Sequence, residues 1–292
     1  MKKNWIMVLC LISIMTLWGC EKDEVVIDEK SPEMTASKET QSSIIDKESK
    51  PLIPVSATDT IKIFVREDGA PGMYLGKDGQ VHGFYVDLEK MVMEEMEQSY
   101  VFVPYHDIGP VAQELKSGTH HIALAAPDLP EYRTFLNLSI PYEVLNYVIF
   151  IQKNNKEIAG STTESLIKSL HGKRVGVQTR GHIFQFLRDI KEIELIEYPT
   201  TTKALEDLNK GLLDAVPDVK RIGIYYANLN HWDIVPLGNP IISNKLTTAI
   251  SKRFEASLLD RYNKALKALI SDGRFDALYE SYFGPMDVQD RP

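Results

Sequence analysis

Arg133 is the residue of this sequence whose chemistry most clearly calls for a partner. It lies in the segment PEYRTFLNLSIPY, residues 130–142, which apart from Glu131 is otherwise aromatic, aliphatic, proline or neutral polar. A guanidinium keeps its proton at every physiological pH and is costly to leave unpaired in a partly closed space. The chemistry that such a group offers is the binding of an anion. Pairing with Glu131 or Asp128 of the same chain, or a position in solvent, is the structural alternative.

The rest of the chain offers little other chemistry. His120 and His121 are neighbours on a predicted strand, where successive side chains point to opposite faces, and no Cys or carboxylate cluster with ligand spacing accompanies them. Gly172-Lys173 lacks the preceding glycine pattern of a phosphate-binding loop, and there is no Gly-x-Ser-x-Gly nucleophile motif. We therefore expect no catalytic residue, no metal site and no cofactor.

The first twenty residues are typical of an export signal. Lys2 and Lys3 precede an apolar stretch, residues 5–18, that has the length of a signal-peptide core and is short for a bilayer-spanning helix. The stretch ends at Leu-Trp-Gly-Cys, which resembles the lipobox of bacterial lipoproteins, whose cysteine is lipidated and becomes the mature N-terminus. We predict lipidation of Cys20. Trp18 is larger than the usual residue of that motif, and a plain secretory signal is the alternative.

Residues 21–60 are predicted to be a flexible tether between a membrane and the folded part. They are rich in Glu, Lys, Ser, Thr and Pro and contain no aromatic residue, so they bury too little apolar surface to offset the entropy of ordering. The formal charge of the chain is −8, and removal of the signal segment takes away two lysines and no acid. An acidic protein of this kind is a poor partner for nucleic acid.

Hydrophobic periodicity in residues 61–292 predicts a repeated alternation of strands and helices. Strands are expected at 61–65, 100–103, 122–126, 174–177, 193–198 and 214–216. Helices are expected at 87–97, at 182–190 and in the segments that end at Gly118 and Gly211. Two successive β-α-β-α-β units predict an α/β protein with two parallel-sheet lobes of similar plan. Helical segments around 254–269 and 275–283 follow, and the pattern assigns them to neither lobe.

Six motifs occur in an order and at spacings that are specific together, although each is weak alone. They are GFYVDL (83–88), LKSG (115–118), EYR followed by SIPY (131–142), GKRVGVQ (172–178), GLLDAV (211–216) and NKALKALISDGRFDALYESYFG (263–284). On these residues, the segment from about 61 to 285 resembles the bacterial extracellular solute-binding proteins of family 3, the receptors of polar amino-acid ABC importers.

The resemblance implies a two-lobe fold of the type II periplasmic-binding-protein kind, in which each lobe is an α/β sandwich. Lobe 1 would comprise residues 61–152 and 249–292, and lobe 2 residues 153–248. The chain would cross between the lobes near 151–154 and near 245–249. A ligand would lie in the cleft between the lobes, where strand ends and helix N-termini converge.

The resemblance also implies which residues of lobe 1 meet the ligand. The arginine that binds the ligand's carboxylate in the family matches Arg133, although the spacing from Arg133 to Ser139 is one residue shorter than usual. Family members carry hydroxyl residues just before this arginine, where the present chain has AAPDLP, with Asp128 as its polar residue. A change of the usual amino-acid ligand is consistent with these departures.

In lobe 2 the family has a Gly-Ser/Thr turn at a helix start, where free N–H groups attract a carboxylate. The corresponding residues here are Thr179, Gly181 and His182. A family acid that binds the ligand's ammonium matches Val219, and the nearest acid of this chain is Asp218, one residue earlier. Because adjacent strand residues point to opposite faces, Asp218 is expected to face away from the cleft unless the strand has a bulge.

Three further side chains are candidates for the walls of the cleft. Tyr74 and Met73 stand where the family often has an aromatic segment after the first strand, and Tyr85 replaces a frequent acid. Each of them is an equally good candidate for the core or its rim, since aromatic residues and Met are often buried for packing alone.

The resemblance implies a monomeric, membrane-tethered receptor outside the cytoplasm. It would close its lobes on a small polar solute, an amino acid or organic acid with a carboxylate, and deliver it to an ABC permease. Two other functions are compatible with the same fold. One is an extracytoplasmic sensor that signals to a partner receptor, and the other is an enzyme similar to cyclohexadienyl dehydratases.

Overall fold

The computed structural model describes residues 51–106, 108–179 and 182–292. The predicted signal segment, the lipidation candidate Cys20 and residues 21–50 of the predicted tether lie outside these ranges.

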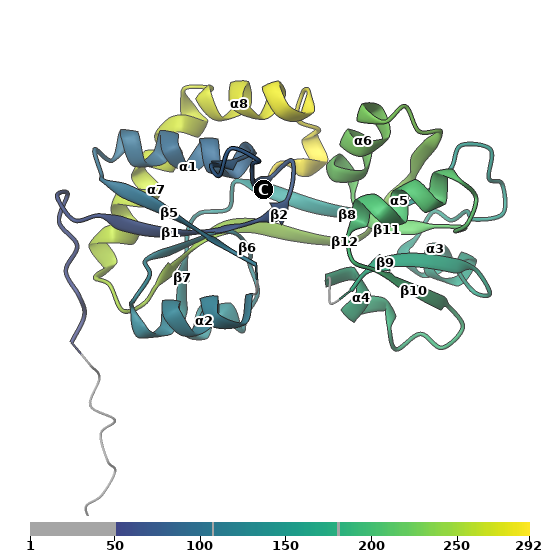
Figure 1. Cartoon of the computed structure of the whole chain (residues 1–292), viewed down its shortest axis with the longest axis horizontal. Helices are drawn as coiled ribbons and strands as arrows, with labels where there is room; N and C mark the ends of the chain where they lie inside the picture. Colours follow the sequence, from purple (N-terminus) through teal and green to yellow (C-terminus); the bar gives the residue numbers. More distant parts are fainter. Residues whose placement is uncertain (1–50, 107, 180–181) are drawn as a thin grey trace, which may run out of the picture. The chain divides into compact units, whose positions relative to one another are not determined.

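The first lobe is built on three parallel strands. They are β1 (Ile61–Arg66), β5 (Tyr100–Tyr105) and β6 (Ile122–Pro127), with β1 in the middle. Apolar side chains of β1 leave both faces of this sheet, because successive residues alternate. Helices α1 (Phe84–Glu95), α7 (Ala256–Ser271) and α8 (Arg274–Phe283) cover one face, and α2 (Ile108–Ser117) covers the other (Figure 1).

The second lobe contains the parallel pair β9 (Arg174–Gln178) and β10 (Glu194–Tyr198). Its helices are α3 (Thr163–Ser169), α4 (His182–Leu187), α5 (Thr201–Asn209) and α6 (Lys220–Leu229). Threonine side chains begin two of these helices: Thr162 caps α3 by accepting from Ser165, and Thr200 caps α5 by accepting from Lys203. The second cap fixes the N-terminus of α5, which borders the cavity described below.

Two long antiparallel strands join the lobes: β8 (Glu143–Gln152) and β12 (Ile234–Ser251). They join the three parallel strands of the first lobe to β11 (Val216–Val219), and the resulting sheet has the order β11-β8-β12-β6-β1-β5. A seventh strand, β7 (Leu136–Leu138), pairs with β12. Leu145 packs in the core of the first lobe and Ile149 in that of the second, so the first crossing precedes the predicted 151–154. The return crossing lies between Ile242 and Leu246, close to the predicted 245–249.

A small antiparallel sheet follows β1. Its strands are β2 (Asp68–Gly69), β3 (Met73–Leu75) and β4 (Val81–His82), and the sequence pattern did not predict them. Short 3-10 helices η1 (Tyr132–Thr134) and η2 (Val288–Asp290) complete the set of elements. The β2–β4 sheet is important because it brings residues 68–73 to the side of the first lobe that borders the cavity.

Residues 51–60, the last part of the predicted tether, lie against the first lobe. The N–H of Ile53 donates to the carbonyl of Arg253 at 2.8 Å, and the N–H of Glu255 donates to the carbonyl of Ile53 at 3.1 Å. Val55 is buried in the core of the first lobe. The side-chain amide of Gln98 donates to backbone carbonyls of this segment, including that of Ser56 at 3.2 Å. Residues 51–60 therefore belong to the folded first lobe and not to a flexible tether.

The predicted class, an α/β fold with two lobes joined by two crossings, agrees with this architecture.

The neighbouring histidines of the first lobe have separate structural roles, since the ring of His120 stacks on Phe64 and the ring of His121 on Phe254. Among the described residues, no helix has both the length and the apolarity needed to cross a membrane.

Glu89 of α1 is a buried carboxyl group in the first lobe. One of its oxygens accepts a hydrogen bond from the hydroxyl of Tyr262 at 2.7 Å, and the other has no partner among the described residues. Burial raises the pKa of Glu89 to about 8, although the Tyr262 hydroxyl opposes the rise. The native protein therefore keeps this proton at pH values where the unfolded chain has released it.

We predict that this proton makes the protein less stable as the pH rises from about 5 to 8. The native state binds one more proton than the unfolded state in this window, so the free energy of unfolding falls by up to about 1.4 kcal/mol per pH unit. Glu89→Gln keeps an acceptor for Tyr262 and removes the titration. Its melting temperature should fall less than that of the wild type between pH 5 and 8; parallel curves would contradict the assignment.

Candidate ligand-binding cavity between the lobes

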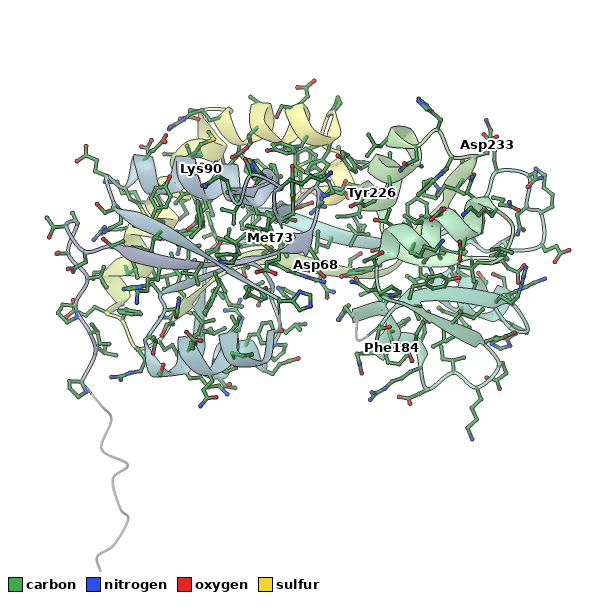
Figure 2. The ribbon with its side chains drawn as sticks, viewed as in Figure 1. Asp68, Met73, Lys90, Phe184, Tyr226 and Asp233 are labelled. Atoms are coloured by element: carbon green, nitrogen blue, oxygen red, sulfur yellow. The ribbon has the colours of Figure 1, made fainter. Side chains whose placement is uncertain are left out.

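A cavity of about 640 Å³ lies between the lobes and is lined by both of them. From the first lobe come the segment after β1 and the end of β6, and from the second come the first residues of α4, α5 and α6. The crossing strands supply Leu145, Tyr147, Asn244 and Leu246. Figure 2 shows Asp68 and Met73 of the first lobe and Tyr226 of the second in the middle of the view, where these walls meet.

Gly83 positions Tyr85 at the wall of the cavity. Gly83 has φ 117°, and a Cβ at this position would lie 2.5 Å from the carbonyl oxygen of Gly72. This close approach lets Phe84 and Tyr85 donate their N–H groups to Pro71 and Gly72 at 3.1 and 2.8 Å. The start of α1 is thereby tied to the loop after β2, and Tyr85 lies at that start.

The hydroxyl of Tyr85 belongs to a buried charged cluster with Glu143 and Arg221, which we call the Arg221 cluster. Tyr85 donates to Oε2 of Glu143 at 2.9 Å, and Arg221 donates through Nε and Nη2 to both oxygens of Glu143. Nη2 of Arg221 also donates to the Tyr85 hydroxyl. Burial is the largest single influence on the pKa of Arg221 and would lower it, but the charge and hydrogen bonds of Glu143 together with the nearby tyrosines raise that pKa above its ordinary value.

Gly223 allows α6 to lie directly on β8. A Cβ at Gly223 would lie 2.2 Å from an atom of the Phe150 ring, so no larger residue fits there without displacing the ring. The close packing places Arg221 and Tyr226 of α6 towards the first lobe. The hydroxyl of Tyr226 donates to the backbone carbonyl of Ala70 at 3.0 Å, which forms a direct hydrogen bond between the lobes.

Asp218 lies in the wall contributed by the second lobe. Its Oδ1 accepts from the N–H of Val219 at 2.5 Å, and the Thr201 hydroxyl also stabilises its charged form. Burial nevertheless raises the pKa of Asp218. No Lys, Arg or His of the described residues forms an ion pair with it, and Arg66 and Arg221 act on it only from a distance. Asp218 is thus an acid facing the cavity without a cationic partner of its own.

Arg66 and Asp68 form an ion pair on the opposite wall. Nε of Arg66 donates to Oδ1 of Asp68 at 2.5 Å, and both side chains are partly exposed. The two terminal nitrogens of Arg66 make no hydrogen bond with the described part of the chain. They remain available as donors at the edge of the cavity, in a geometry suited to a carboxylate.

Arg133 has the structural arrangement that the sequence left open as an alternative. Its Nε and Nη2 donate to the two oxygens of Asp128 at 2.8 and 2.7 Å, and its side chain is 56% exposed. Neither Arg133 nor Asp128 lines the cavity, whereas their neighbours Leu129 and Tyr132 do. Among the described residues, the arginines that line it are Arg66 and Arg221.

The other predicted contacts divide into two groups. Met73, Tyr85, His182 and Asp218 line the cavity. Tyr74 does not, and its ring lies 5.7 Å from that of His82. Thr179 does not line it either, because its N–H and hydroxyl both donate to the carbonyl of Tyr198, at 2.9 and 3.2 Å. Gly181 lies outside the described residues.

The sequence leaves open whether Asp218 or Val219 faces the cleft, since Asp218 would face away only in a strand that alternates without a bulge. Strand β11 ends at Val219, and α6 begins at the next residue, so strict alternation no longer applies at this point. Both Asp218 and Val219 line the cavity. Analysis of the sequence also failed to identify Arg66 and Arg221 as residues that line the cavity. Arg66 had a detectable signal, since it is a cation directly after a buried strand, but nothing local marked Arg221.

Comparison with known proteins agrees with this architecture. The profile of the bacterial extracellular solute-binding proteins, family 3, matches residues 61–285. The match spans most of the chain, and the protein belongs to this family.

Its similarity to individual proteins is more distant. Over 239 residues it is 22% identical to ABC transporter arginine-binding protein 1 of Escherichia coli K12, covering 78% of this chain and 92% of that protein. A solved ancestral cationic amino acid solute-binding protein is 26% identical, with a TM-score of 0.66, and the alignment covers 77% of this chain and 95% of the other. A histidine kinase sensor domain gives the same TM-score at 21% identity, with 79% and 99% of the two chains covered.

We predict that Arg133→Ala has little effect on either stability or ligand binding. Its ion pair with Asp128 is largely exposed, and such pairs contribute about 1 kcal/mol or less. Since Arg133 does not line the cavity, the dissociation constant of a bound solute should change by less than about twofold. Isothermal titration calorimetry decides the point: a tenfold loss of affinity would restore the carboxylate-binding role implied by the family resemblance.

Proposed function

We propose that the protein is a receptor that closes its lobes on a small amino-acid-like solute outside the cytoplasm and delivers it to an ABC permease. The observation that supports this proposal best is a carboxylate without an ion-pair partner and an arginine with spare donors on opposite walls of one cavity. Among the described residues, Asp218 of the second lobe has no cationic partner, and the two terminal nitrogens of Arg66 of the first lobe make no hydrogen bond. A solute with an ammonium and a carboxylate group would satisfy both.

The chemistry of the cavity favours a zwitterion or cation over a simple anion. Asp68 pairs with Arg66, and Glu143 pairs with Arg221, so each arginine has a carboxylate partner. Among the described residues that line the cavity, the charge without an ion-pair partner is the negative charge of Asp218. A half-buried carboxylate without an ion-pair partner has lost part of its hydration, and a ligand ammonium would replace it. The volume of about 640 Å³ is within the range of small-molecule sites.

A binding function requires no reaction. A ligand that contacts both lobes binds the closed form more tightly than the open form, and this difference alone drives closure. The arginine-binding relative and the cationic amino acid-binding structure support an amino acid as ligand, and both are described as binding proteins. We therefore infer a non-enzymatic receptor.

A thermal-shift screen of the purified protein tests the proposed ligand class. The probes are L-arginine, L-lysine, L-histidine, L-glutamine, L-glutamate and succinate. A ligand that binds only the native state raises its melting temperature in proportion to ln(1 + [L]/Kd). An increase with one or more of the amino acids and none with succinate is expected. An increase with succinate alone would contradict the role given to Asp218.

We predict that Asp218→Asn weakens the binding of the best amino acid by at least about tenfold. The substitution keeps the size of the side chain and removes a charge-assisted hydrogen bond, which contributes about 1.5–3 kcal/mol. The matched control is Asp189→Asn, because Asp189 is an aspartate of the same lobe whose side chain is exposed. Calorimetry should show unchanged affinity for the control. Equal affinities of the two variants would remove Asp218 from the site.

The membrane anchor is a separate part of the proposal, in which a lipid attached to Cys20 holds the protein at the membrane. We predict that Cys20→Ser releases the protein from the membrane fraction of cells, because the substitution removes the thiol that would carry the lipid. Fractionation followed by immunoblotting measures this, with Cys10→Ser as the matched control that should stay membrane-bound. Retention of the Cys20→Ser variant in membranes would show that something other than a lipid on Cys20 holds the protein there.

A sensory role is the second candidate function, and the similarity to a histidine kinase sensor domain favours it. The two roles differ in what the loss of the protein does to a cell. A transport receptor is required for uptake of its ligand, whereas a sensor is required for a response of gene expression to that ligand. Uptake of the radiolabelled amino acid identified in the screen, compared between wild-type and deletion cells, distinguishes them.

A further inference from the structure

The Arg221 cluster is the most deeply buried charged group that links the two lobes. Of the ion pairs between described residues, the pair of Arg221 and Glu143 is the one in which both side chains are buried, with exposures of 8% and 1%. Arg221 belongs to α6 of the second lobe. Glu143 is the first residue of β8, before the crossing, and Tyr85 lies in the core of the first lobe. The guanidinium therefore reaches from one lobe into the interior of the other.

Arg221 borders a cavity on each side of its contact with the first lobe. Arg221 lines the cavity described above and also a second cavity of about 650 Å³, which is bordered by α6, α8 and the segment after α8. Its guanidinium carbon lies 4.8 Å from the centre of the Phe283 ring, and its Nη1 has no hydrogen-bond partner in the described part of the chain. Arg221 thus borders both cavities.

Other bonds between the lobes are fewer in number or more exposed. Tyr226 donates one hydrogen bond to the backbone of Ala70 at 3.0 Å. Lys220 pairs with Asp287 at 2.8 Å, but both side chains are partly exposed, and such pairs contribute little. Separation of the lobes at α6 would break all the hydrogen bonds of Arg221 to the first lobe at once.

We propose that the Arg221 cluster acts as a latch that holds the lobes together and so sets the fraction of protein in the closed, binding-competent form. The apparent dissociation constant of a ligand equals its intrinsic value divided by that fraction. Arg221 is then a positioning residue: it acts on binding through the position of the lobes. The effect on affinity rests on the proposed function, whereas the effect on lobe separation does not.

The first test compares one tyrosine that is hydrogen-bonded to Arg221 with one that is not. The hydroxyls of Tyr85 and Tyr262 are both buried and both donate to a buried glutamate of the first lobe, at 2.9 and 2.7 Å. Only the hydroxyl of Tyr85 also accepts from Arg221 of the second lobe. Tyr85→Phe is therefore expected to loosen the lobes, and Tyr262→Phe serves as the matched control.

The separation of the lobes is measured by double electron–electron resonance without added ligand. The full chain carries Cys10→Ser and Cys20→Ser, which remove both native cysteines, and spin labels are attached at Glu280→Cys in the first lobe and Lys191→Cys in the second. Both sites are exposed. Tyr85→Phe should shift the distance distribution away from that of the wild type and towards longer distances, and Tyr262→Phe should not.

A second variant removes both charges of the Arg221 cluster, so its effect on lobe separation should be larger than that of Tyr85→Phe. Glu143→Gln combined with Arg221→Met removes both buried charges together, which avoids leaving one charge unpaired and is tolerated better than a single removal. It should show longer distances than Tyr85→Phe and bind L-arginine about tenfold more weakly than the wild type. Saturation with L-arginine should return its distances to those of the liganded wild type.

Unchanged distances in both Tyr85→Phe and the double variant would overturn the latch, whatever happens to affinity. Weaker binding with unchanged distances would mean that the cluster only shapes the cavity wall, and would also overturn it. If L-arginine and the other amino acids fail to bind the wild type, the proposed function fails, and the comparison of distances still decides on the latch.

Discussion

The antiparallel pairing of β8 with β12 is the constraint on which both lobes and the cavity depend. These two strands form the middle of a sheet that continues from β11 in the second lobe to β5 in the first. Their side chains also line the cavity, through Leu145, Tyr147, Asn244 and Leu246. Because the backbone hydrogen bonds of the pair are satisfied within the sheet, the connection between the lobes is a structured ribbon, in contrast to a loose linker. The cavity walls can therefore move only as this ribbon bends or twists.

Charge pairing determines what the cavity presents to a ligand. Three arginines of this region have carboxylate partners within the chain: Arg66 with Asp68, Arg133 with Asp128, and Arg221 with Glu143. The partner in each case fixes the position of the guanidinium. Only Asp218 faces the cavity without such a partner among the described residues. The recognition chemistry is thus set by the one charged side chain that the fold leaves uncompensated, together with the free nitrogens of Arg66.

The periodicity of the sequence was sufficient for the alternation of strands and helices, because buried strands such as β1 and helices such as α7 have clear apolar patterns. It did not show that β8 and β12 are long strands shared by both lobes, since their side chains pack first in one core and then in the other. Arg133 was a reasonable candidate by type and position. Its pairing with Asp128 depends on side-chain directions that the local sequence does not determine.

The Arg221 cluster could not have been found from a single sequence. Arg221 is 78 residues from Glu143 and 136 residues from Tyr85, and it meets them only after both lobes have folded. The direction of Asp218 stayed open in the sequence for a different reason, namely that the strand ends beside it and the alternation rule ends with the strand. Long-range pairing and the exact ends of elements are properties of the packed molecule, and here both of them decide which charges reach the cavity.

The backbone bonds of Ile53 to the start of α7 have a mechanical consequence. The polypeptide enters the folded unit on the first lobe, and the second lobe is attached covalently only through β8 and β12. Any load applied from upstream of residue 51 would be borne by the first lobe, and the bending ribbon would not have to transmit it. The second lobe would then be the part that swings while its neighbour stays in place.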